Sequence, residues 1–424
     1  MRRASPVSVV FPPDPVDVPS VSAASGTAGV SAPPSEQTPR DVPRTVKFHA
    51  PEIVFGVGSL QEAAYAAARL GATRPMLVTD AGLIEAGWVH EILGYLGECG
   101  LTATVWAGLT PNPKDFEVTA GHEAYRAHGC DVLVALGGGS VIDAAKGIAV
   151  LAANGGDILD YEGVDRAVAP IPPMVVVPTT SGTGADVSQF CVVTDTARGA
   201  KVTIIGRSLV PDLTVIDPRL LTTMPDELNA ATGLDALTHG VEAFVSRAHN
   251  PLTDHHALRA VGLVTGTLVR TIDDPHEMQA RSAMAQASLA AGLAFTNAIL
   301  GATHAMSHQV GGLFDLPHGV VNGVLLPHVI RFNAESDPEP FIAIAAALGL
   351  DEHRGPALEA ALAVADRVER LARDVGVPRG LRELGVQDAD LERLAVGALH
   401  DACMSTNPRD ASREQMVALF RAAL

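Results

Sequence analysis

Short apolar segments alternate with helix-length segments through the first half of the chain, and this alternation constrains the fold more than any other feature. Turn residues bound each apolar segment. Runs this short and this apolar are typical of strands buried on both faces of a sheet. Strands that alternate with helices predict a mainly parallel sheet covered by helices on both faces, and segment 190–218 is expected to add strands. The apolar segments read PMLVTD (75–80), TATVWAG (102–108), CDVLVALGGG (130–139) and PMVVVPTT (173–180).

The composition of the sequence and the spacing of its apolar residues change twice, and these changes divide the chain into three parts. Residues 1–44 hold nine prolines among small residues, without a helical or strand period, which predicts a disordered extension. Residues 45–222 are expected to form the α/β domain. From Pro225 onward the chain is rich in alanine and leucine at helical spacing, so residues 223–424 are expected to form an all-helical domain.

Charge and cysteine content narrow the functional class. Acidic residues outnumber basic ones 48 to 30, and the net charge of −18 argues against a nucleic-acid or anionic-membrane partner. Small-molecule substrates are more compatible with this net charge than nucleic acids or anionic membranes are. The four cysteines lack CxxC spacing, so neither a disulfide framework nor a cysteine zinc site is indicated, and a reducing cytoplasm is expected. No apolar run reaches the roughly 18 residues of a membrane span, so a soluble protein is expected.

A strand, three glycines and a helix follow one another in DVLVALGGGSVIDAAKGIAVLA (131–152). Gly137, Gly138 and Gly139 would let the backbone approach a ligand, and free amides at the helix start would hold a phosphate. Ser140 and Asp143 also form an S-x-x-D capping box, which explains both residues as well as ligand contact does. The motif is not GxGxxG, which weakens the interpretation as an ordinary Rossmann fold.

Two further segments at strand ends carry polar residues suited to a cofactor. Asp80 ends the strand of PMLVTDAGL, where a carboxylate accepts hydrogen bonds from an adenosine ribose and repels a 2′-phosphate. A helix cap explains the same residue equally well. The segment PTTSGTGADVS (178–188) is rich in hydroxyls and glycine, although a generic loop has the same composition.

Histidines and one aspartate recur at helical spacing in the second half. Asp235 and His239 lie four residues apart in ATGLDALTHGVEAF, and so do His304 and His308 in GATHAMSHQVGGLFDLPH, which ends at His318. Residues four apart share a helix face. A carboxylate with several imidazoles is a donor set for Fe or Zn. The adjacent pair in TDHHALRAV, at 255–256, points two ways, and we interpret it as surface or packing residues.

With these motifs together, the sequence resembles the iron-containing (group III) alcohol dehydrogenase family from about Val46 to the C-terminus. The resemblance implies an NAD-binding α/β domain and a helical metal-binding domain, with the active site in the cleft between them. Two departures are the Gly184-Ala185-Asp186 sequence, where GSE is usual, and the proline-rich extension, which is not a family feature. The matching segments are FGVGSL, VTD, TPNP, GGGSVIDAAK, PTTSGTGADVS, GLDALTHGVEAF, HAMSH to LPHG, and NPRD.

The resemblance also implies roles for individual residues. The metal ligands would be Asp235, His239, His304 and His318, and the catalytic residues would be His308, Asp235 and His304, with His308 beside the metal and the nicotinamide. The NAD contacts would be Asp80, Asn112, Gly138, Gly139, Ser140, Thr179, Thr180, Thr183, Ser188 and Lys201. Phe190, Val192 and Phe295 would line the substrate pocket.

The implied function is a metal- and NAD-dependent alcohol dehydrogenase or aldehyde reductase for small primary alcohols. Fe(II) is the expected metal, although the ligands suit Zn(II) or Mn(II) too, and a homodimer is favoured because two-fold assemblies are commonest. Alternatives are enzymes like maleylacetate reductase or glycerol dehydrogenase, a lyase like dehydroquinate synthase, and a non-catalytic binding protein. The lyase needs a basic pocket, for which the histidine segments supply no lysine or arginine.

Overall fold

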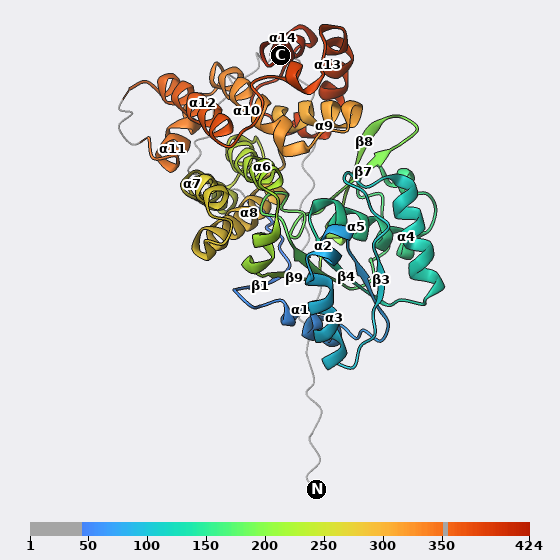
Figure 1. The fold of residues 1–424 in the computed structure, drawn as a ribbon. Helices are drawn as coiled ribbons and strands as arrows, with labels where there is room; N and C mark the ends of the chain where they lie inside the picture. Colours follow the sequence, from blue (N-terminus) through green and yellow to red (C-terminus); the bar gives the residue numbers. More distant parts are fainter. Residues whose placement is uncertain (1–44, 351–354) are drawn as a thin grey trace, which may run out of the picture. The chain divides into compact units, whose positions relative to one another are not determined.

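A computed structural model of the chain describes residues 45–350 and 355–424, so the predicted disorder of residues 1–44 lies outside the described residues. The first half forms a six-stranded sheet in the order β1-β9-β6-β4-β2-β3, and every neighbouring pair is parallel (Figure 1). The central strands β4 and β6 are buried along their whole length, which explains their continuous apolar sequence. The strands are β1 (Glu52–Phe55), β2 (Pro75–Val78), β3 (Thr104–Trp106), β4 (Val132–Gly137), β6 (Met174–Pro178) and β9 (Leu213–Ile216).

Helices cover both faces of this sheet. On one face, residues of α1 and α3 share a buried cluster with Leu77, Val134 and Val177. On the other face, α4 and α5 pack against Met76 and Leu133, because successive strand residues point to opposite faces. The predicted mainly parallel α/β architecture is therefore confirmed. These helices are α1 (Gln61–Arg69), α2 (Ala81–Glu85), α3 (Trp88–Glu98), α4 (Asp115–Ala127) and α5 (Gly139–Asn154).

Segment 190–218 contains strands as expected, but only β9 joins the parallel sheet. Strands β7 (Phe190–Asp195) and β8 (Ala200–Ile205) form an antiparallel hairpin that pairs with β5 (Gly163–Val164) in a separate three-stranded sheet. A tight turn between β7 and β8 reverses the direction of the chain. The Asp195 carboxylate stabilises this turn, because it accepts from the backbone N–H groups of Ala197 and Arg198.

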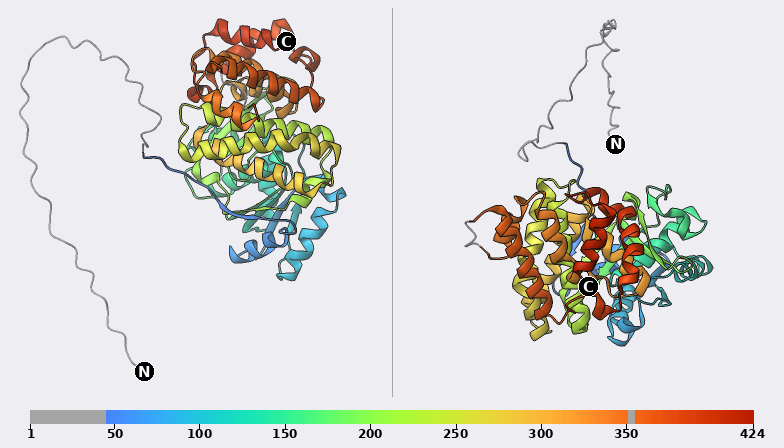
Figure 2. Two further views of the ribbon diagram at one scale, coloured as in Figure 1. Left: turned by 90° about the vertical axis from the view of Figure 1, so that its left-hand side faces the viewer. Right: turned by 90° about the horizontal axis from the view of Figure 1, so that it is seen from above.

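The second half of the described chain is helical, as predicted (Figures 1 and 2). Helix α6 is buried around its whole circumference from Asn229 to Val245, which places it in the interior of this part. The sheet ends at Ile216 and α6 begins at Asp226, while the exact domain boundary at residues 222–223 stays a prediction. The helices are α6 (Asp226–Val245), α7 (Pro251–Asp273), α8 (Met278–Ala298), α9 (Ala302–Phe314), α10 (His318–Ala334), α11 (Pro340–Ala347), α12 (Ala357–Asp374), α13 (Leu391–His400) and α14 (Arg413–Ala422).

Short 3-10 helices connect these elements. Within the described residues, no single helix is long and apolar enough to cross a membrane, and one pair that meets the length and composition together, α8 with α9, is bent by 103°. The 3-10 helices are η1 (Ile158–Tyr161), η2 (Arg207–Leu209), η3 (Pro218–Thr223), η4 (Leu381–Leu384), η5 (Asp388–Asp390) and η6 (Ala402–Thr406).

Candidate metal and cofactor site

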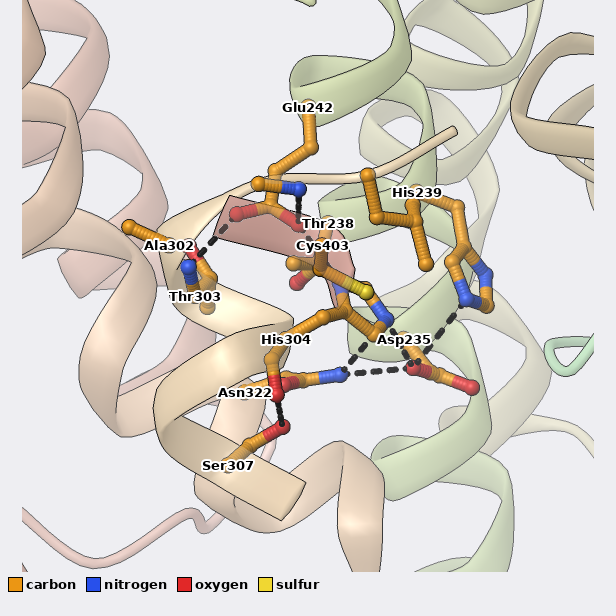
Figure 3. A network of polar contacts seen from close by, with 12 residues as sticks. Asp235, Thr238, His239, Glu242, Ala302, Thr303, His304, Ser307, Asn322 and Cys403 are labelled. Atoms are coloured by element: carbon orange, nitrogen blue, oxygen red, sulfur yellow. Dashed lines mark hydrogen bonds and ion pairs between the residues drawn. The ribbon is translucent and has the colours of Figure 1, made fainter. Parts of the chain in front are cut away.

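Helices α6, α9 and α10 gather one carboxylate and three imidazoles, of which Asp235, His239 and His304 place donor atoms within 4.8 Å of one another. Asp235 and His239 lie one turn apart on α6, His304 comes from α9, and His318 is the first residue of α10. The three imidazole Nε2 atoms lie 3.7 to 3.9 Å from the same oxygen, Oδ1 of Asp235 (Figure 3 shows three of these residues). These separations are too long for hydrogen bonds and suit donors that share one ion.

The second nitrogen of His239 and of His304 has its own hydrogen-bond partner. The His239 Nδ1 lies 3.1 Å from the Gly182 carbonyl oxygen, and the His304 Nδ1 lies 2.6 Å from Glu242 Oε2. Both acceptors lack protons, so each Nδ1 carries a hydrogen, and each Nε2 is the ring atom that faces Asp235. A metal-binding histidine is usually held in this way.

The Nδ1 of His318 also has a hydrogen-bond partner, which is a hydroxyl group. The Ser307 hydroxyl donates to the His304 carbonyl oxygen at 3.2 Å, so it is free to accept from the His318 Nδ1 at 3.3 Å. Close backbone packing places His318, because a Cβ at its neighbour Gly319 would lie 1.9 Å from the Ala231 carbonyl oxygen of α6. Only glycine permits this approach of α10 to α6.

Glu242 is a functional candidate that the sequence analysis missed. Its carboxylate is 2% exposed and accepts from the backbone N–H groups of Gly301 and Thr303 at the start of α9, as well as from His304 (Figure 3). A buried glutamate three residues after His239 on an apolar helix was the signal that could have found it. Its partner lies 62 residues away in sequence, which no local pattern reveals.

Burial and charge shift the protonation of the four candidate ligands. Burial would raise the pKa of Asp235, but the imidazoles of His239, His304 and His318 outweigh it and hold that pKa below its usual range. Burial lowers the pKa of His239 to about 4 and that of His318 well below its usual value. Burial alone would lower the pKa of His304 too, but Glu242 and Asp235 raise it to about 9. Without a bound ion, one proton therefore remains on this cluster at neutral pH.

His308 lies beside this cluster, stacked on His318 with ring centroids 5.3 Å apart. Its Nδ1 lies 2.8 Å from Asp401 Oδ2, and Asp401 also accepts from the Cys403 backbone N–H at the start of η6. Asp401 is a second residue that the sequence analysis missed, because it lies 93 residues from its partner. A hydrogen-bonded Asp–His pair next to the candidate ligands can hold or pass a proton.

The three strand ends expected to meet a cofactor lie at one edge of the sheet. In the register of the sheet, Gly137 of β4 pairs with Pro178 of β6. Strand β2 pairs with the other side of β4, and Asp80 follows the end of β2. The segments touch, because a Cβ at Gly138 would lie 2.9 Å from the Thr180 side chain. The structure therefore brings most of the predicted NAD-contacting positions together, namely Gly138, Gly139, Ser140, Thr179, Thr180 and Thr183.

Polar atoms at this edge fit a polar ligand. In the part of the chain that the structure describes, the buried hydroxyl oxygens of Thr79, Thr180 and Ser181 have no hydrogen-bond partner. Helix α5 starts at Gly139 without a side-chain cap, so its first N–H groups remain available to an anion. Thr79 and Ser181 were not among the predicted contacts, although both flank predicted ones.

The predicted capping box of Ser140 and Asp143 is wrong. Helix α5 begins one residue before Ser140, so Ser140 lies inside the first turn rather than at the cap. Its hydroxyl accepts instead from the backbone N–H of Asn112 at 3.2 Å. For Asp80 the structure shows the helix-cap contact, since its carboxylate accepts from the Leu83 N–H of α2 at 3.0 Å.

Asn112 and Lys201, two further predicted NAD contacts, meet each other. The Lys201 Nζ donates to Asn112 Oδ1 at 3.0 Å, and the Asn112 amide donates to Asp315 Oδ1 at 2.7 Å. Asn112 has a φ of +55°, in the left-handed region, which asparagine tolerates better than most residues. Lys201 lies on β8, so the hairpin carries a cation toward α9.

Lys146 organises the segment that follows β6. Its ammonium is completely buried and donates to the carbonyl oxygens of Ala185, Ser188 and Phe190 at 2.6 to 2.9 Å, and to the Ser188 hydroxyl at 3.2 Å. It thereby ties α5 to the predicted contact Ser188 and to the start of β7. Lys146 is the lysine of the GGGSVIDAAK motif, but nothing in that motif indicates this role.

Replacing Lys146 with methionine is expected to lower the free energy of unfolding by about 3 kcal/mol, because several buried carbonyl oxygens lose a charged donor. Urea unfolding would measure the change. Arg126→Met, which removes an exposed charge from α4, serves as the control and is expected to change the free energy by at most about 0.5 kcal/mol. Equal effects of the two substitutions would contradict the role assigned to Lys146.

Aromatic side chains adjoin the candidate metal ligands. The Phe295 ring stacks on His239 with centroids 4.3 Å apart, and Phe190 lies 5.7 Å from Phe295. Val192 is two residues from Phe190 on β7 and so faces the same side. The structure thus brings Phe190 and Phe295 together, with Val192 on the same face of β7 as Phe190. His255 is exposed and His256 stacks on Phe48, in agreement with their interpretation as surface and packing residues.

Comparison with known proteins provides independent evidence on the family of this chain. Residues 50–218 match the model of the iron-containing alcohol dehydrogenases, and residues 229–424 match that of the C-terminal part of the same family. The 1,3-propanediol dehydrogenase of Klebsiella pneumoniae is 42% identical over 380 residues, which cover 89% of this chain and 97% of that protein. The NAD-dependent methanol dehydrogenase of Bacillus methanolicus is 38% identical over 377 residues, covering 89% and 99%.

The fold agrees with solved structures as well. A crystal structure of 1,3-propanediol oxidoreductase superimposes with a TM-score of 0.87 at 41% identity, covering 90% of this chain and all of that one. Sulfoacetaldehyde reductase from Bifidobacterium kashiwanohense, solved in complex with NAD+, gives a TM-score of 0.81 at 28% identity, covering 90% and 99%. Agreement over this length includes both the sheet and the helical part.

Proposed function

Because the chain belongs to the iron-containing alcohol dehydrogenase family and is an NAD-dependent oxidoreductase acting on CH–OH donors, we propose that it interconverts a small primary alcohol or diol and the corresponding aldehyde. One observation carries the proposal. Three imidazole Nε2 atoms converge on Asp235 Oδ1, immediately beside the stacked ring of Phe295. A polar cluster against an aromatic wall suits a short substrate with one hydroxyl or carbonyl at its end.

Asp235, His239, His304 and His318 would hold the metal ion, for which we propose Fe(II). When bound, the ion supplies Lewis acidity toward the substrate oxygen, and the nicotinamide exchanges the hydride. Glu242 holds the proton on the Nδ1 of His304 and so keeps that imidazole oriented. His308, held by Asp401, would take up or return the hydroxyl proton.

The NAD site would lie at the edge formed by the ends of β2, β4 and β6. The uncapped start of α5 would hold the pyrophosphate, and Asp80 would accept from the adenosine ribose. The remaining contacts would be Asn112, Thr179, Thr180, Thr183, Ser188 and Lys201. Phe190, Val192 and Phe295 would line the substrate pocket.

Two properties of the protein in the cell are part of the proposal. The absence of CxxC spacing among the four cysteines supports a cytoplasmic location. A homodimer is proposed because closed two-fold assemblies are the commonest oligomers.

The function can be tested by anaerobic NAD reduction with a panel of short primary alcohols, diols and hydroxy acids. Metal-stripped protein would be reconstituted separately with Fe(II) and Zn(II). Turnover of a short alcohol that depends on one of the metals supports the proposal. Protein that binds both metal and NAD yet turns over none of the panel would contradict the proposed substrate class.

Asp80 is expected to set the preference for NAD over NADP. Replacing it with asparagine keeps a good helix cap but removes the charge that repels a 2′-phosphate. We expect the ratio of kcat/KM with NAD to kcat/KM with NADP to fall by roughly tenfold or more. Steady-state kinetics with both cofactors measure the ratio, and an unchanged melting temperature confirms that the cap survives. An unchanged ratio would argue against the ribose contact.

A further inference from the structure

A cavity of about 390 Å³ lies outside the metal cluster, between the N-terminal segment of the described chain, the start of β7 and the end of α8. Three basic side chains line it and no carboxylate does. Its volume is within the usual range for small-ligand sites. The lining residues are Lys47, Phe48, His49, Gln189, Arg207, Thr296 and Asn297.

The charge of this cavity contrasts with that of the whole protein. Acidic residues outnumber basic ones 48 to 30 in the chain, yet every ionisable residue that lines the cavity is basic. Among the described residues, Lys47 and Arg207 form no ion pair and no hydrogen bond through their side chains. Two cations without a partner on one concave surface favour an anionic ligand.

The walls of the cavity are fixed by hydrogen bonds. Asn297 holds His49 reciprocally, since its Oδ1 accepts from the His49 N–H at 2.8 Å and its Nδ2 donates to the His49 carbonyl oxygen at 3.1 Å. Gln189 is held by Thr296, through contacts of 3.0 Å to the hydroxyl and 2.6 Å to the carbonyl oxygen. These bonds anchor the N-terminal segment on α8 and hold Lys47 near the cavity.

Two residues that line the cavity are next in sequence to Phe190 and Phe295, which form the aromatic wall of the candidate substrate pocket. Gln189 precedes Phe190, and Thr296 follows Phe295, whose ring stacks on the candidate ligand His239. Gln189 and Thr296 line the cavity, whereas Phe190 and Phe295 do not. A ligand in the cavity would thus lie behind the aromatic wall rather than in front of it.

We propose that this cavity is a binding site for a small doubly charged oxyanion, a phosphate or dicarboxylate, held by Lys47 and Arg207 and separate from the NAD pyrophosphate site. Amide and hydroxyl groups of Gln189, Thr296 and Asn297 border the same cavity and supply neutral polar contacts. The assignment does not depend on the identity of the alcohol substrate.

Isothermal titration calorimetry of the full-length, metal-loaded and NAD-saturated protein tests the assignment. Inorganic phosphate and succinate are the two probes, and their comparison distinguishes phosphate from carboxylate ligands. Saturating NAD removes the competing pyrophosphate site. We expect saturable binding of at least one probe, and a loss of affinity of roughly tenfold or more in the double variant Lys47→Gln/Arg207→Gln.

The control variant is Arg259→Gln, which removes one exposed arginine of α7 outside the cavity. It is expected to bind the probe as the unmodified protein does. Both substituted residues of the double variant are exposed, so its fold should persist, and retained NAD affinity would confirm this. Failure of both probes to bind saturably, or equal binding by the double variant and the unmodified protein, would overturn the assignment.

Discussion

Replacing Asp235 with asparagine is expected to lower kcat/KM by about a thousandfold and to leave the purified protein short of metal. The oxygen that faces all three imidazoles becomes a neutral amide oxygen, which is a weaker donor to a divalent ion than a carboxylate is. Lewis-acid stabilisation contributes several kcal/mol to such a reaction, and about 4 kcal/mol corresponds to the expected factor. Asparagine has nearly the same shape and can still accept from Asn322, so the fold should be kept.

Three measurements make this test decisive. Steady-state kinetics give kcat/KM, elemental analysis gives the metal content, and fluorescence titration gives the affinity for NAD. That affinity should be unchanged, because within the described residues the hydrogen bond and close charge contacts of Asp235 go to α6, α9 and α10 and not to the segments at the sheet edge. Asp273→Asn, at the exposed end of α7, is the matched control and should retain full activity and metal. Full metal content and activity in Asp235→Asn would exclude this carboxylate as a ligand.

The affinity of the metal-free protein for Zn(II) is expected to rise roughly a hundredfold between pH 7 and pH 9. The pKa of His304 is about 9, so below that pH a proton occupies its Nε2 and must leave before an ion can bind. Each unit of increasing pH then raises the affinity about tenfold, until the proton is lost in the free protein as well. His239 and His318 add no such dependence in this range, because burial lowers the pKa of both.

Glu242→Gln separates this mechanism from a general effect of pH. Without the carboxylate, the His304 proton leaves at lower pH, so the increase in affinity should level off before pH 9. A neutral amide oxygen accepts more weakly from Nδ1 than the carboxylate does, which should also lower the affinity at pH 9 by about tenfold. Competition with a chromophoric chelator measures both effects, and the exposed Glu123→Gln is the control. A pH profile that Glu242→Gln leaves unchanged would contradict the role assigned to Glu242.

The sequence predicted those parts of the site that depend on local spacing. Asp235 and His239 share a helix face because they are four residues apart, and the buried strands were visible as apolar runs. Glu242 and Asp401 were missed because their partners lie 62 and 93 residues away. Hydrogen bonds of this kind are set by how helices pack, and packing leaves no period in the sequence.

The errors have equally physical causes. The S-x-x-D pattern of Ser140 and Asp143 predicted a cap, but the glycines before it let the helix begin one residue earlier, with no side-chain cap. The strands expected in segment 190–218 are present, but their composition did not reveal that β7 and β8 lie outside the parallel sheet. Their pairing was decided by the turn at Asp195, which reverses the chain and makes a hairpin instead.

The approach of Gly319 to the Ala231 carbonyl oxygen has a consequence for metal selection. Backbone packed on backbone cannot shift as a side chain can, so His318 is held at a nearly constant distance from the helix that carries Asp235 and His239. A cage of this kind cannot expand or contract to suit ions of different radius. It should therefore distinguish ions by size, and loading it should cost little conformational entropy, because the donors are already in place.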